Sequence, residues 1–520
     1  MVSLTFYGGA GEIGGNKILL EDGETRLFFD FGTSFKKRAK YFEEYLNPRP
    51  GAGLLDLLEL GLLPPLKGLL RDDLATPELW QQFESSPLYR ELRVDGVLLS
   101  HAHTDHSGYI SFLNAEIPIY ATTMTAFIAK AMQDSGPTNF EREVCYLNLR
   151  ELKDGYYRLQ GDYKLRPYVF LDQGLLGQEA LEFWNSAPTK KKKLAADSIL
   201  NESGKIGRLN FKFFPVDHSI PGAAAFAVES SSGWIAYTGD LRLHGKRGEQ
   251  TKKFAEELYK LRPYILLCEG TRLEDRPNVS EEEVYDNCLK TVREAKGLVI
   301  ADFGPRNIER LFTFYEIACR TQRNLLILAK DAYLLDAMHL ASTEIPRIED
   351  LPCLLIYKDF KSRFAFWEEK LYERYRAKII SSGEIRQRPQ DFILCFSFWD
   401  INDLVDIAPR GGTYIYSSSE VFDEEGTMDI WRLNNWLSHF GMKAVGLPRE
   451  ELEWEIPPEE RGFHASGHAG GADLVNLIRQ IKPQILIPIH TENPGYFEQK
   501  LKGTGIKVLI PSEGQTISFL

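Results

Sequence analysis

The feature that most constrains this chain is one run of six residues, His101-Ala102-His103-Thr104-Asp105-His106. Four of its side chains are of the kinds that bind metal ions. Neither a helix nor a strand can turn four such closely spaced side chains to one face. The run is therefore predicted to form a turn that folds around something. Imidazole and carboxylate groups together suit zinc or a similar divalent metal.

More side chains of ligand type come directly after predicted strands. They are His218 after 211–214, Asp240 after 234–237, Glu269 after 265–267 and His490 after 485–489. In α/β proteins, functional sites assemble at the edge where the strands end. One such residue would more often be an ordinary edge residue, but this many, together with the histidine-rich run, predict a shared metal site.

Length and composition exclude several classes of protein. The chain has 520 residues, of which 43% are hydrophobic and 26% charged, so it can bury a large core in more than one domain. No stretch reaches the ~18 consecutive apolar residues of a membrane span, and the N-terminus does not resemble a signal peptide. The six cysteines form no CxxC pair. These features predict a reduced, cytoplasmic protein with no membrane partner.

The net charge of −12 argues against a protein that coats duplex DNA through bulk positive charge. It still allows a local basic groove for nucleic acid. The candidate segments are Lys36-Lys37-Arg38, Lys246-Arg247, Lys252-Lys253 and Lys358 to Arg363. Each of them is, by itself, more often a solvated surface run.

The glycine-rich segment near the N-terminus matches a dinucleotide-binding pattern but lacks its context. Gly9 to Gly14 reads G-x-G-x-x-G, and a helix should follow it in a dinucleotide-binding fold. Instead, the apolar residues at 17–20 and 27–29 flank the turn pair Asp22-Gly23, which predicts a β-hairpin. The glycines are therefore interpreted as places of close backbone approach beside a site.

The chain after residue 270 alternates predicted helices and strands, which indicates a parallel α/β unit that continues to about residue 455. Residues 36–90 and 134–207 are irregular and are interpreted as insertions. Further along, residues 464–471 combine histidines, a serine and glycines directly before a predicted helix. Because main-chain N–H groups at a helix start attract anions, His464, Ser466, Gly467 and His468 are predicted to bind phosphate.

These motifs together resemble a known family. The run 101–106 is similar to the H-x-H-x-D-H signature of the metallo-β-lactamase fold, and Gly9 to Asn16, Asp30, His218 and Asp240 match its flanking motifs in order. Later motifs narrow the resemblance to the β-CASP nucleases, and most closely to ribonuclease J-like proteins. They are Glu269-Gly270-Thr271, Asp302 to Gly304 with Asn307 to Arg310, His464 to Ala469, and Pro488 to Glu492. One departure is Glu269-Gly270-Thr271, which in ribonuclease J usually reads Asp-Ser-Thr.

The resemblance implies a fold and a domain order. The fold is α/β, a metallo-β-lactamase αββα sandwich with an inserted α/β β-CASP domain. The sandwich would comprise residues 1–270, with insertions near 36–90 and 134–207, and residues 456–520. The β-CASP domain would comprise residues 271–455.

The resemblance also implies a set of metal ligands. His101, His103 and His218 would hold one divalent ion, Asp105, His106 and His490 would hold a second, and Asp240 would bridge them. Zinc is favoured for both ions, with Mn²⁺ or Mg²⁺ as alternatives. Asp30 and Glu269 would orient ligands through hydrogen bonds.

The expected chemistry is hydrolysis of a phosphodiester bond by an activated water between two metals. Catalytic roles fall to Asp105, Asp240, Glu269 and His468. His468 would be the general acid that protonates the leaving oxygen, and Glu269 would orient a neighbouring histidine.

Several function classes stay open at this point. The first is an endonuclease or 5′-exonuclease that acts on single-stranded RNA, and the second is a DNA-directed nuclease on the same scaffold. A small-molecule metallo-hydrolase is third, and a non-catalytic scaffold is last, because every ligand position is filled. The C-terminal domain that aids dimerisation in many relatives is not expected here, so a homodimer is left open.

Overall fold

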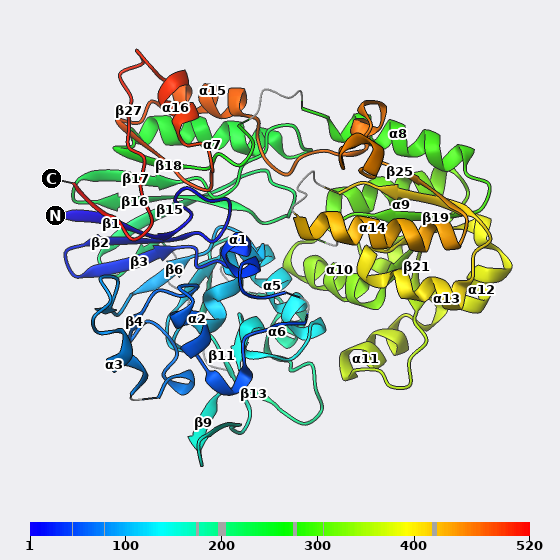
Figure 1. The fold of residues 1–520 in the computed structure, drawn as a ribbon, viewed down its shortest axis with the longest axis horizontal. Helices are drawn as coiled ribbons and strands as arrows, with labels where there is room; N and C mark the ends of the chain where they lie inside the picture. Colours follow the sequence, from blue (N-terminus) through cyan, green and yellow to red (C-terminus); the bar gives the residue numbers. More distant parts are fainter. Residues whose placement is uncertain are drawn as a thin grey trace. The chain divides into compact units, whose positions relative to one another are not determined.

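The computed structural model describes residues 1–520 except 44, 77, 173–175, 196–203, 274–277, 305, 419–423 and 520. The chain divides into two compact units (Figure 1). Unit 1 comprises residues 1–243, 247–275 and 468–520, and unit 2 comprises residues 244–246 and 276–467.

The described part of unit 1 contains two large sheets of seven strands each. In spatial order, the first sheet contains β12 (Tyr168–Phe170), β7 (Ile119–Ala121), β6 (Gly96–Leu98), β3 (Thr25–Phe29), β2 (Lys17–Asp22), β1 (Val2–Gly8) and β28 (Thr516–Phe519). The second contains β14 (Lys205–Ile206), β15 (Leu209–Pro215), β16 (Ala224–Ser230), β17 (Gly233–Tyr237), β18 (Ile265–Cys268), β26 (Ile485–Pro488) and β27 (Lys507–Val508). β17, β18, β26 and β27 run parallel, so their carboxyl ends share one edge.

The first strands show why these sheets stack. β2 and β3 pair antiparallel from Ile18 opposite Phe29 to Asp22 opposite Thr25, which confirms the predicted hairpin. Alternate apolar side chains of the first sheet, such as Ile18 and Phe29, share one buried core with Phe226 and Ile487 of the second sheet. The two sheets therefore pack face to face, as expected when each presents an apolar face.

Helices cover the outer faces. α7 (Gly248–Leu261) and α15 (Gly471–Ile481) lie side by side on the second sheet (Figure 1) and bury Leu258 and Ile478 against it. On the first sheet, α5 (Thr123–Ser135) contacts β12. The order of layers is thus helix, sheet, sheet, helix. The other helices of unit 1 are α1 (Phe35–Ala39), α2 (Leu55–Glu59), α3 (Leu79–Phe83), α4 (Thr104–Ser107), α6 (Gln178–Asn185) and α16 (Gly495–Lys500).

The two expected insertions form small elements of their own. Residues 36–90 contribute α2 and α3, and their β4 (Leu66–Lys67) pairs with β5 (Arg90–Glu91). Residues 134–207 contribute the hairpin β9 (Arg150–Lys153) and β10 (Tyr156–Leu159), and a small sheet of β8 (Tyr146–Leu147), β11 (Tyr163–Leu165) and β13 (Leu194–Ala195). Residues 173–175 and 196–203 of the second insertion lie outside the described residues.

Unit 2 is built on one sheet in which every described strand pair is parallel. Its spatial order is β22 (Ile379–Ser381), β21 (Leu354–Lys358), β20 (Asn324–Leu328), β23 (Phe392–Cys395), β19 (Leu298–Asp302), β24 (Gly412–Tyr416) and β25 (Met442–Val445). The helices are α8 (Glu281–Glu294), α9 (Ile308–Arg320), α10 (Ala329–Ala341), α11 (Phe366–Arg374), α12 (Ser382–Gln387), α13 (Leu404–Ile407) and α14 (Glu424–His439). The predicted parallel α/β unit is confirmed.

The chain leaves unit 2 later than the expected boundary at residue 455. Residues 456–467 belong to unit 2 because the short 3₁₀ helix η10 (Pro458–Phe463) packs against α8. The amide of Asn287 on α8 donates a hydrogen bond to the carbonyl oxygen of Gly462 at 3.0 Å. Along the sequence, the compact units change at 275 and 467, and the expected domain limits at 270 and 455 stay a prediction.

Candidate metal centre

The predicted ligands come together in unit 1 from five places in the sequence. They are His101 and His103 between β6 and α4, Asp105 and His106 within α4, His218 after β15, Asp240 after β17, and His490 after β26. The histidine-rich run thus forms a turn that continues into a short helix. The parallel strands β17, β18 and β26 place Asp240, Glu269 and His490 at the same edge of the sheet.

A first group of side chains consists of three histidines and one carboxylate. The ligand atoms of His101, His103, His218 and Asp240 all lie within 4.8 Å of one another. Nδ1 of His103 lies 3.1 Å from Nε2 of His101 and 3.1 Å from Nε2 of His218. Three imidazoles with a carboxylate match the donor types of zinc sites.

A second group shares the same carboxylate. The ligand atoms of Asp105, His106, Asp240 and His490 also lie within 4.8 Å of one another. Nε2 of His106 lies 3.1 Å from Oδ2 of Asp240 and 3.3 Å from Nε2 of His490. Nε2 of His490 lies 3.1 Å from Oδ2 of Asp105. Two ligand sets therefore meet at Asp240.

The electrostatics around Asp240 suit a bound cation. Burial opposes ionisation of this carboxyl, but the neighbouring His106 and His490 hold its pKa well below the usual range. Its buried Oδ1 accepts no hydrogen bond from any residue that the structure describes. A buried anionic oxygen without a donor, surrounded by imidazole nitrogens, is the arrangement expected of a metal ligand. The residues present thus fit a divalent metal ion.

Asp30 orients the ring of His106 by binding the nitrogen that does not face Asp240. Oδ2 of Asp30 accepts a hydrogen bond from Nδ1 of His106 at 2.7 Å, which leaves Nε2 of His106 directed toward Asp240. The main-chain N–H and the hydroxyl of Ser100 both donate to Asp30 at 2.7 Å, and the hydroxyl of Tyr237 donates to it as well. A carboxylate that receives so many donors holds one geometry and fixes the tautomer of the histidine.

Glu269 and Thr271 form a second support. The Thr271 hydroxyl donates to Oε2 of Glu269 at 2.7 Å and lies 2.8 Å from Nδ1 of His490. With the hydroxyl proton directed to Glu269, the oxygen of Thr271 accepts from Nδ1–H of His490. This leaves Nε2 of His490 as the ring atom that faces Asp105. No pattern in the sequence indicates this role of Thr271.

His468 lies beside the ligand sets and contacts Glu269. Its Nδ1 lies 3.0 Å from Oε2 of Glu269 and 4.0 Å from Oδ2 of Asp240. Burial lowers the pKa of His468, but Glu269 and Asp240 outweigh this effect and raise it to about 9. Burial also opposes ionisation of Glu269, whose pKa is nevertheless lowered by His468. The pair therefore favours an imidazolium next to a carboxylate.

A buried ion pair that the sequence analysis missed ties two ligand loops together. Nε and Nη2 of Arg242 donate to the two carboxylate oxygens of Asp217 at 3.1 and 2.8 Å, and both side chains are buried. The main-chain N–H of Arg242 also donates to the carbonyl of Asp217 at 2.7 Å. Asp217 directly precedes His218, and Arg242 lies two positions after Asp240. One residue pair therefore fixes the spacing of ligands from two strands.

The glycine interpretation is confirmed at Gly14, and Gly32, which it did not include, makes a similar close approach. A Cβ on Gly14 would lie 2.8 Å from Cβ of Asp105, and one on Gly32 would lie 1.7 Å from the carbonyl oxygen of Asp105. Only glycine permits this close approach to the loop that carries Asp105 and His106. Nζ of the buried Lys17 donates to the carbonyls of Gly15 and Gly32 at 2.7 and 3.0 Å, which links the two glycine segments.

The predicted phosphate-binding residues belong to both units. His464, Ser466 and Gly467 lie in unit 2, and His468 lies in unit 1. Nδ1 and Nε2 of the buried His464 lie 2.7 Å from the carbonyl of Ser418 and 2.8 Å from that of Gly446. The ring therefore faces main-chain oxygens, which favours a role in holding these loops. Phosphate binding at these residues stays a prediction.

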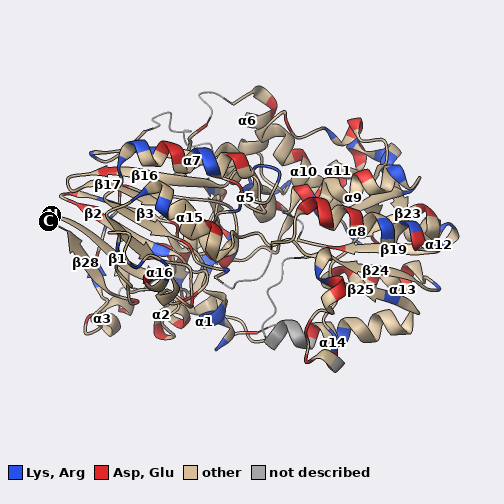
Figure 2. Cartoon of the chain, turned by 90° about the horizontal axis from the view of Figure 1, so that it is seen from above, with Lys and Arg blue, Asp and Glu red and all other residues tan. Residues whose placement is uncertain are grey.

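The basic segments are accompanied by acidic groups. On α1, Lys36 pairs with Glu492, Lys37 with Glu12 and Glu513, and Arg38 with Glu141. Basic and acidic positions also alternate along α7 (Figure 2). Paired charges attract a polyanion less than unpaired ones, so these contacts weaken the prediction of a nucleic-acid path along α1.

Comparisons with known proteins show what the chain is similar to. Residues 461–511 match the family described as "Zn-dependent metallo-hydrolase RNA specificity domain". The chain is 20% identical over 513 residues to ribonuclease J of Helicobacter pylori, covering 94% of this chain and 56% of that protein. It is 26% identical over 320 residues to ribonuclease J of Mycoplasma pneumoniae, covering 58% of this chain and 50% of that protein. The chain is therefore similar to ribonuclease J.

The recognition made from the sequence motifs is thereby confirmed, as is the α/β fold class. A crystal structure of a protein of unknown function from Enterococcus faecalis has a TM-score of 0.67 to this ribonuclease J-like chain at 22% identity, and the likeness covers 99% of both chains. The two chains therefore share a fold over nearly their whole length. The chain spans about half the length of the ribonuclease J proteins from H. pylori and M. pneumoniae. None of the helices that the structure describes is long and apolar enough to cross a membrane.

Proposed function

We propose that this chain is a metal-dependent phosphodiesterase that cleaves single-stranded RNA. The observation that carries the proposal is the meeting of two ligand sets at Asp240, with His468 directly beside them. The similarity to ribonuclease J supports the chemistry, and the match of residues 461–511 to an RNA specificity domain supports the substrate.

Two divalent ions, with zinc favoured, would occupy the two ligand sets. His101, His103 and His218 would hold one ion, Asp105, His106 and His490 the other, and Asp240 would contact both. When bound, such ions polarise phosphate oxygens and make hydroxide available near neutral pH. Mn²⁺ and Mg²⁺ are alternatives that elemental analysis distinguishes.

The side chains around the ligands supply orientation and a proton. Asp30 and Thr271 fix the ring directions of His106 and His490. Glu269 accepts a hydrogen bond from Nδ1–H of His468, so the proton for the leaving oxygen resides on Nε2 of His468. The carboxylate of Glu269 beside His468 favours the protonated ring that a general acid needs.

The test is cleavage of end-labelled RNA and DNA of the same sequence, each with a 5′-monophosphate and a 5′-triphosphate end. RNA should be degraded and DNA much less so, and the product lengths distinguish endonucleolytic from 5′-exonucleolytic action. Binding should weaken with salt, with a slope of ~0.7 per phosphate contact on a log–log plot. If neither nucleic acid binds at low salt while a lactone or thioester is hydrolysed, the proposal is wrong. A cytoplasmic location and a homodimer stay predictions.

A further inference from the structure

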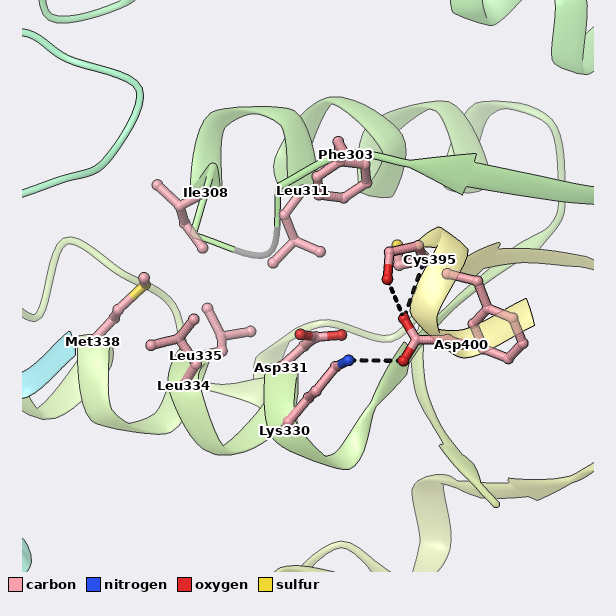
Figure 3. A pocket seen from close by; sticks show the side chains of 12 residues that line it. Phe303, Ile308, Leu311, Lys330, Asp331, Leu334, Leu335, Met338, Cys395 and Asp400 are labelled. Atoms are coloured by element: carbon pink, nitrogen blue, oxygen red, sulfur yellow. Dashed lines mark hydrogen bonds and ion pairs between the residues drawn. The ribbon is translucent and has the colours of Figure 1, made fainter. Parts of the chain in front are cut away.

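Unit 2 contains a pocket that the proposed chemistry does not use. Figure 3 shows it between α10 on one side and the start of α9 with Phe303 on the other, with Cys395 and Asp400 at one end. Phe303 directly follows β19, α10 directly follows β20, and Cys395 ends β23. These three neighbouring strands run parallel. The pocket thus lies where α/β proteins bind ligands, at the carboxyl ends of parallel strands.

The walls of this pocket are aliphatic and elongated. One face of α10 carries Asp331 and, three, four and seven residues after it, Leu334, Leu335 and Met338. At a rise of about 1.5 Å per residue, this face extends for roughly 10 Å. Leu311 of α9 lies opposite it (Figure 3). A narrow apolar floor of this length suits a linear chain of methylene groups.

The polar end carries a carboxylate that has no cation of its own. Oδ2 of Asp331 accepts a hydrogen bond from the main-chain N–H of Leu328 at 3.2 Å. Among the residues that the structure describes, Asp331 forms no ion pair, and its Oδ1 accepts no hydrogen bond. The nearby Lys330 instead pairs with Asp400 at 2.7 Å. When Asp331 is ionised, the polar end therefore has two carboxylates and one lysine, which leaves one negative charge unbalanced.

This charge decides which ligands fit. Asp400 also accepts two hydrogen bonds from Ser397, at 3.0 Å from its N–H and 2.7 Å from its hydroxyl, so its acceptor capacity is used within the protein. A phosphate or carboxylate would meet two carboxyl groups, Asp331 and Asp400, and only one cation, Lys330, which already pairs with Asp400. A group that carries a positive charge and N–H donors would complete the hydrogen bonding of Asp331 instead.

We propose that this pocket binds an alkylammonium ion, a primary ammonium group on an unbranched chain of methylene groups. The ammonium contacts Oδ1 of Asp331, and the methylene groups lie along Leu334, Leu335 and Met338. Free polyamines and lysine side chains both carry this group. The pocket lies in unit 2 and the metal ligands lie in unit 1, so this proposal does not depend on the proposed nuclease function.

The electrostatics of Asp331 agree with this assignment. Burial raises the pKa of Asp331 to about 7, and the charge of Asp400 adds to the effect while Lys330 opposes it. The charged groups around it are Lys330 from α10 and Asp400 from the 3₁₀ helix η8 (Phe398–Asp403), with the Cys395 thiol from β23. The residues that face it from α9 are apolar. A bound cation would therefore favour the ionised carboxylate that burial disfavours.

The experiment is calorimetric titration of the full-length protein with n-butylammonium, 1-butanol and butyrate, which share a chain and differ in charge. The ammonium should bind at one site per chain, and the alcohol and the acid should bind at least roughly ten-fold more weakly. Extending the chain from three to five carbons should tighten binding roughly four-fold per methylene group. Affinity should rise by roughly ten-fold or more from pH 5.5 to pH 8, because the cation binds the ionised carboxylate.

Two variants with the same change of charge make the test specific. Asp331→Asn retains an oxygen for the N–H of Leu328 but loses the charge, and it should abolish the preference for the ammonium. Asp350→Asn changes an exposed carboxylate at η5 (Ile348–Asp350) and should bind as the wild type does. Titration with 1,4-diaminobutane and with capped lysine identifies the source, since tighter binding of either supports the shared chemistry and names its carrier.

The proposal is overturned if the alcohol binds as well as the ammonium, or if Asp350→Asn loses as much affinity as Asp331→Asn. If Asp331→Asn does not fold, the wild-type protein still decides the question. Equal affinity for ammonium and alcohol at every pH from 5.5 to 8 would exclude the site.

Discussion

Two regions of the molecule place acidic side chains at the carboxyl ends of parallel strands, with opposite results. In unit 1, Asp105 and Asp240 lie among histidines, and these neighbours hold the pKa of both carboxyls below the usual range although burial opposes it. In unit 2, Asp302 and Asp331 lie in mainly apolar surroundings, and burial raises the pKa of each to about 7. The position in the fold is the same, and the neighbouring side chains differ.

The comparison shows that a strand end by itself does not define a metal centre. The cluster in unit 1 has its ligands fixed from behind by Asp30, Thr271 and the pair of Asp217 with Arg242. The described residues contain no group of metal-binding side chains at the corresponding edge of unit 2. Ionised carboxylates in unit 1 therefore suit divalent cations, and the less ionised carboxyls in unit 2 suit a weaker, single-charged ligand.

The largest effect is expected from removal of the carboxylate that both ligand sets share. Asp240→Ala should release the bound metal and reduce RNA cleavage to the level of chelator-treated protein, because Asp240 belongs to every ligand group of the cluster. Metal content by mass spectrometry and cleavage of end-labelled RNA are the measurements. Asp331→Asn should leave both unchanged. Full metal content in Asp240→Ala would show that the cluster does not depend on this residue.

Loss of His468 should lower the rate of cleavage and leave the metal content unchanged. We expect His468→Ala to lower kcat by ~10²–10⁴-fold, the usual range for a positioned acid or base. Metal content should stay at the wild-type value, since His468 lies outside the two histidine-rich ligand sets. His439→Ala, on α14 of unit 2, is the matched control. Cleavage at the wild-type rate by His468→Ala would make His468 a structural residue.

The supporting ion pair gives a smaller effect. Asp217→Asn keeps the shape of the side chain but removes the charge that Arg242 contacts. We expect metal affinity to fall ~10–100-fold, as is typical when a group that orients ligands is changed. Cobalt titration followed by visible absorption measures the affinity without relying on catalysis. An unchanged affinity, with the protein still folded, would limit this pair to a structural role.

The ligands themselves could be predicted from the sequence, and their supports could not. A histidine or aspartate just after an apolar run can be recognised as a candidate ligand, because the run itself predicts the strand that carries it. Thr271 and Tyr237 show no such signal, since a hydroxyl has many structural uses. Asp217 and Arg242 are 25 residues apart, and nothing local indicates that they pair.

The architecture was likewise predictable where the hydrophobic pattern was regular. The hairpin of β2 and β3 and the parallel sheet of unit 2 follow from turn residues and from the alternation of helices and strands. The late return at residue 467 was not predictable, because it depends on the contact of η10 with α8. The pocket beside α10 also needs three-dimensional information, since its lining comes from three separate segments.

The smallest expected effect is a pH dependence confined to unit 2. Burial raises the pKa of Asp302 to about 7, the charge of Asp400 adds to this, and the hydroxyl of Tyr414 opposes it by donating a hydrogen bond. The unfolded chain ionises this carboxyl near pH 4. The folded state therefore binds more protons between pH 4 and 7, and stability should fall by about 1.4 kcal/mol per pH unit as the pH rises through this window.

Asp302→Asn should remove that slope while keeping an acceptor for Tyr414. Hydrogen exchange of β19 and β24, compared between wild type and variant at each pH, reports on unit 2 alone, and Asp350→Asn serves as the control. Parallel pH profiles for wild type and Asp302→Asn would mean that this strand end is solvated, and that the contrast with the metal centre is weaker than the buried geometry indicates.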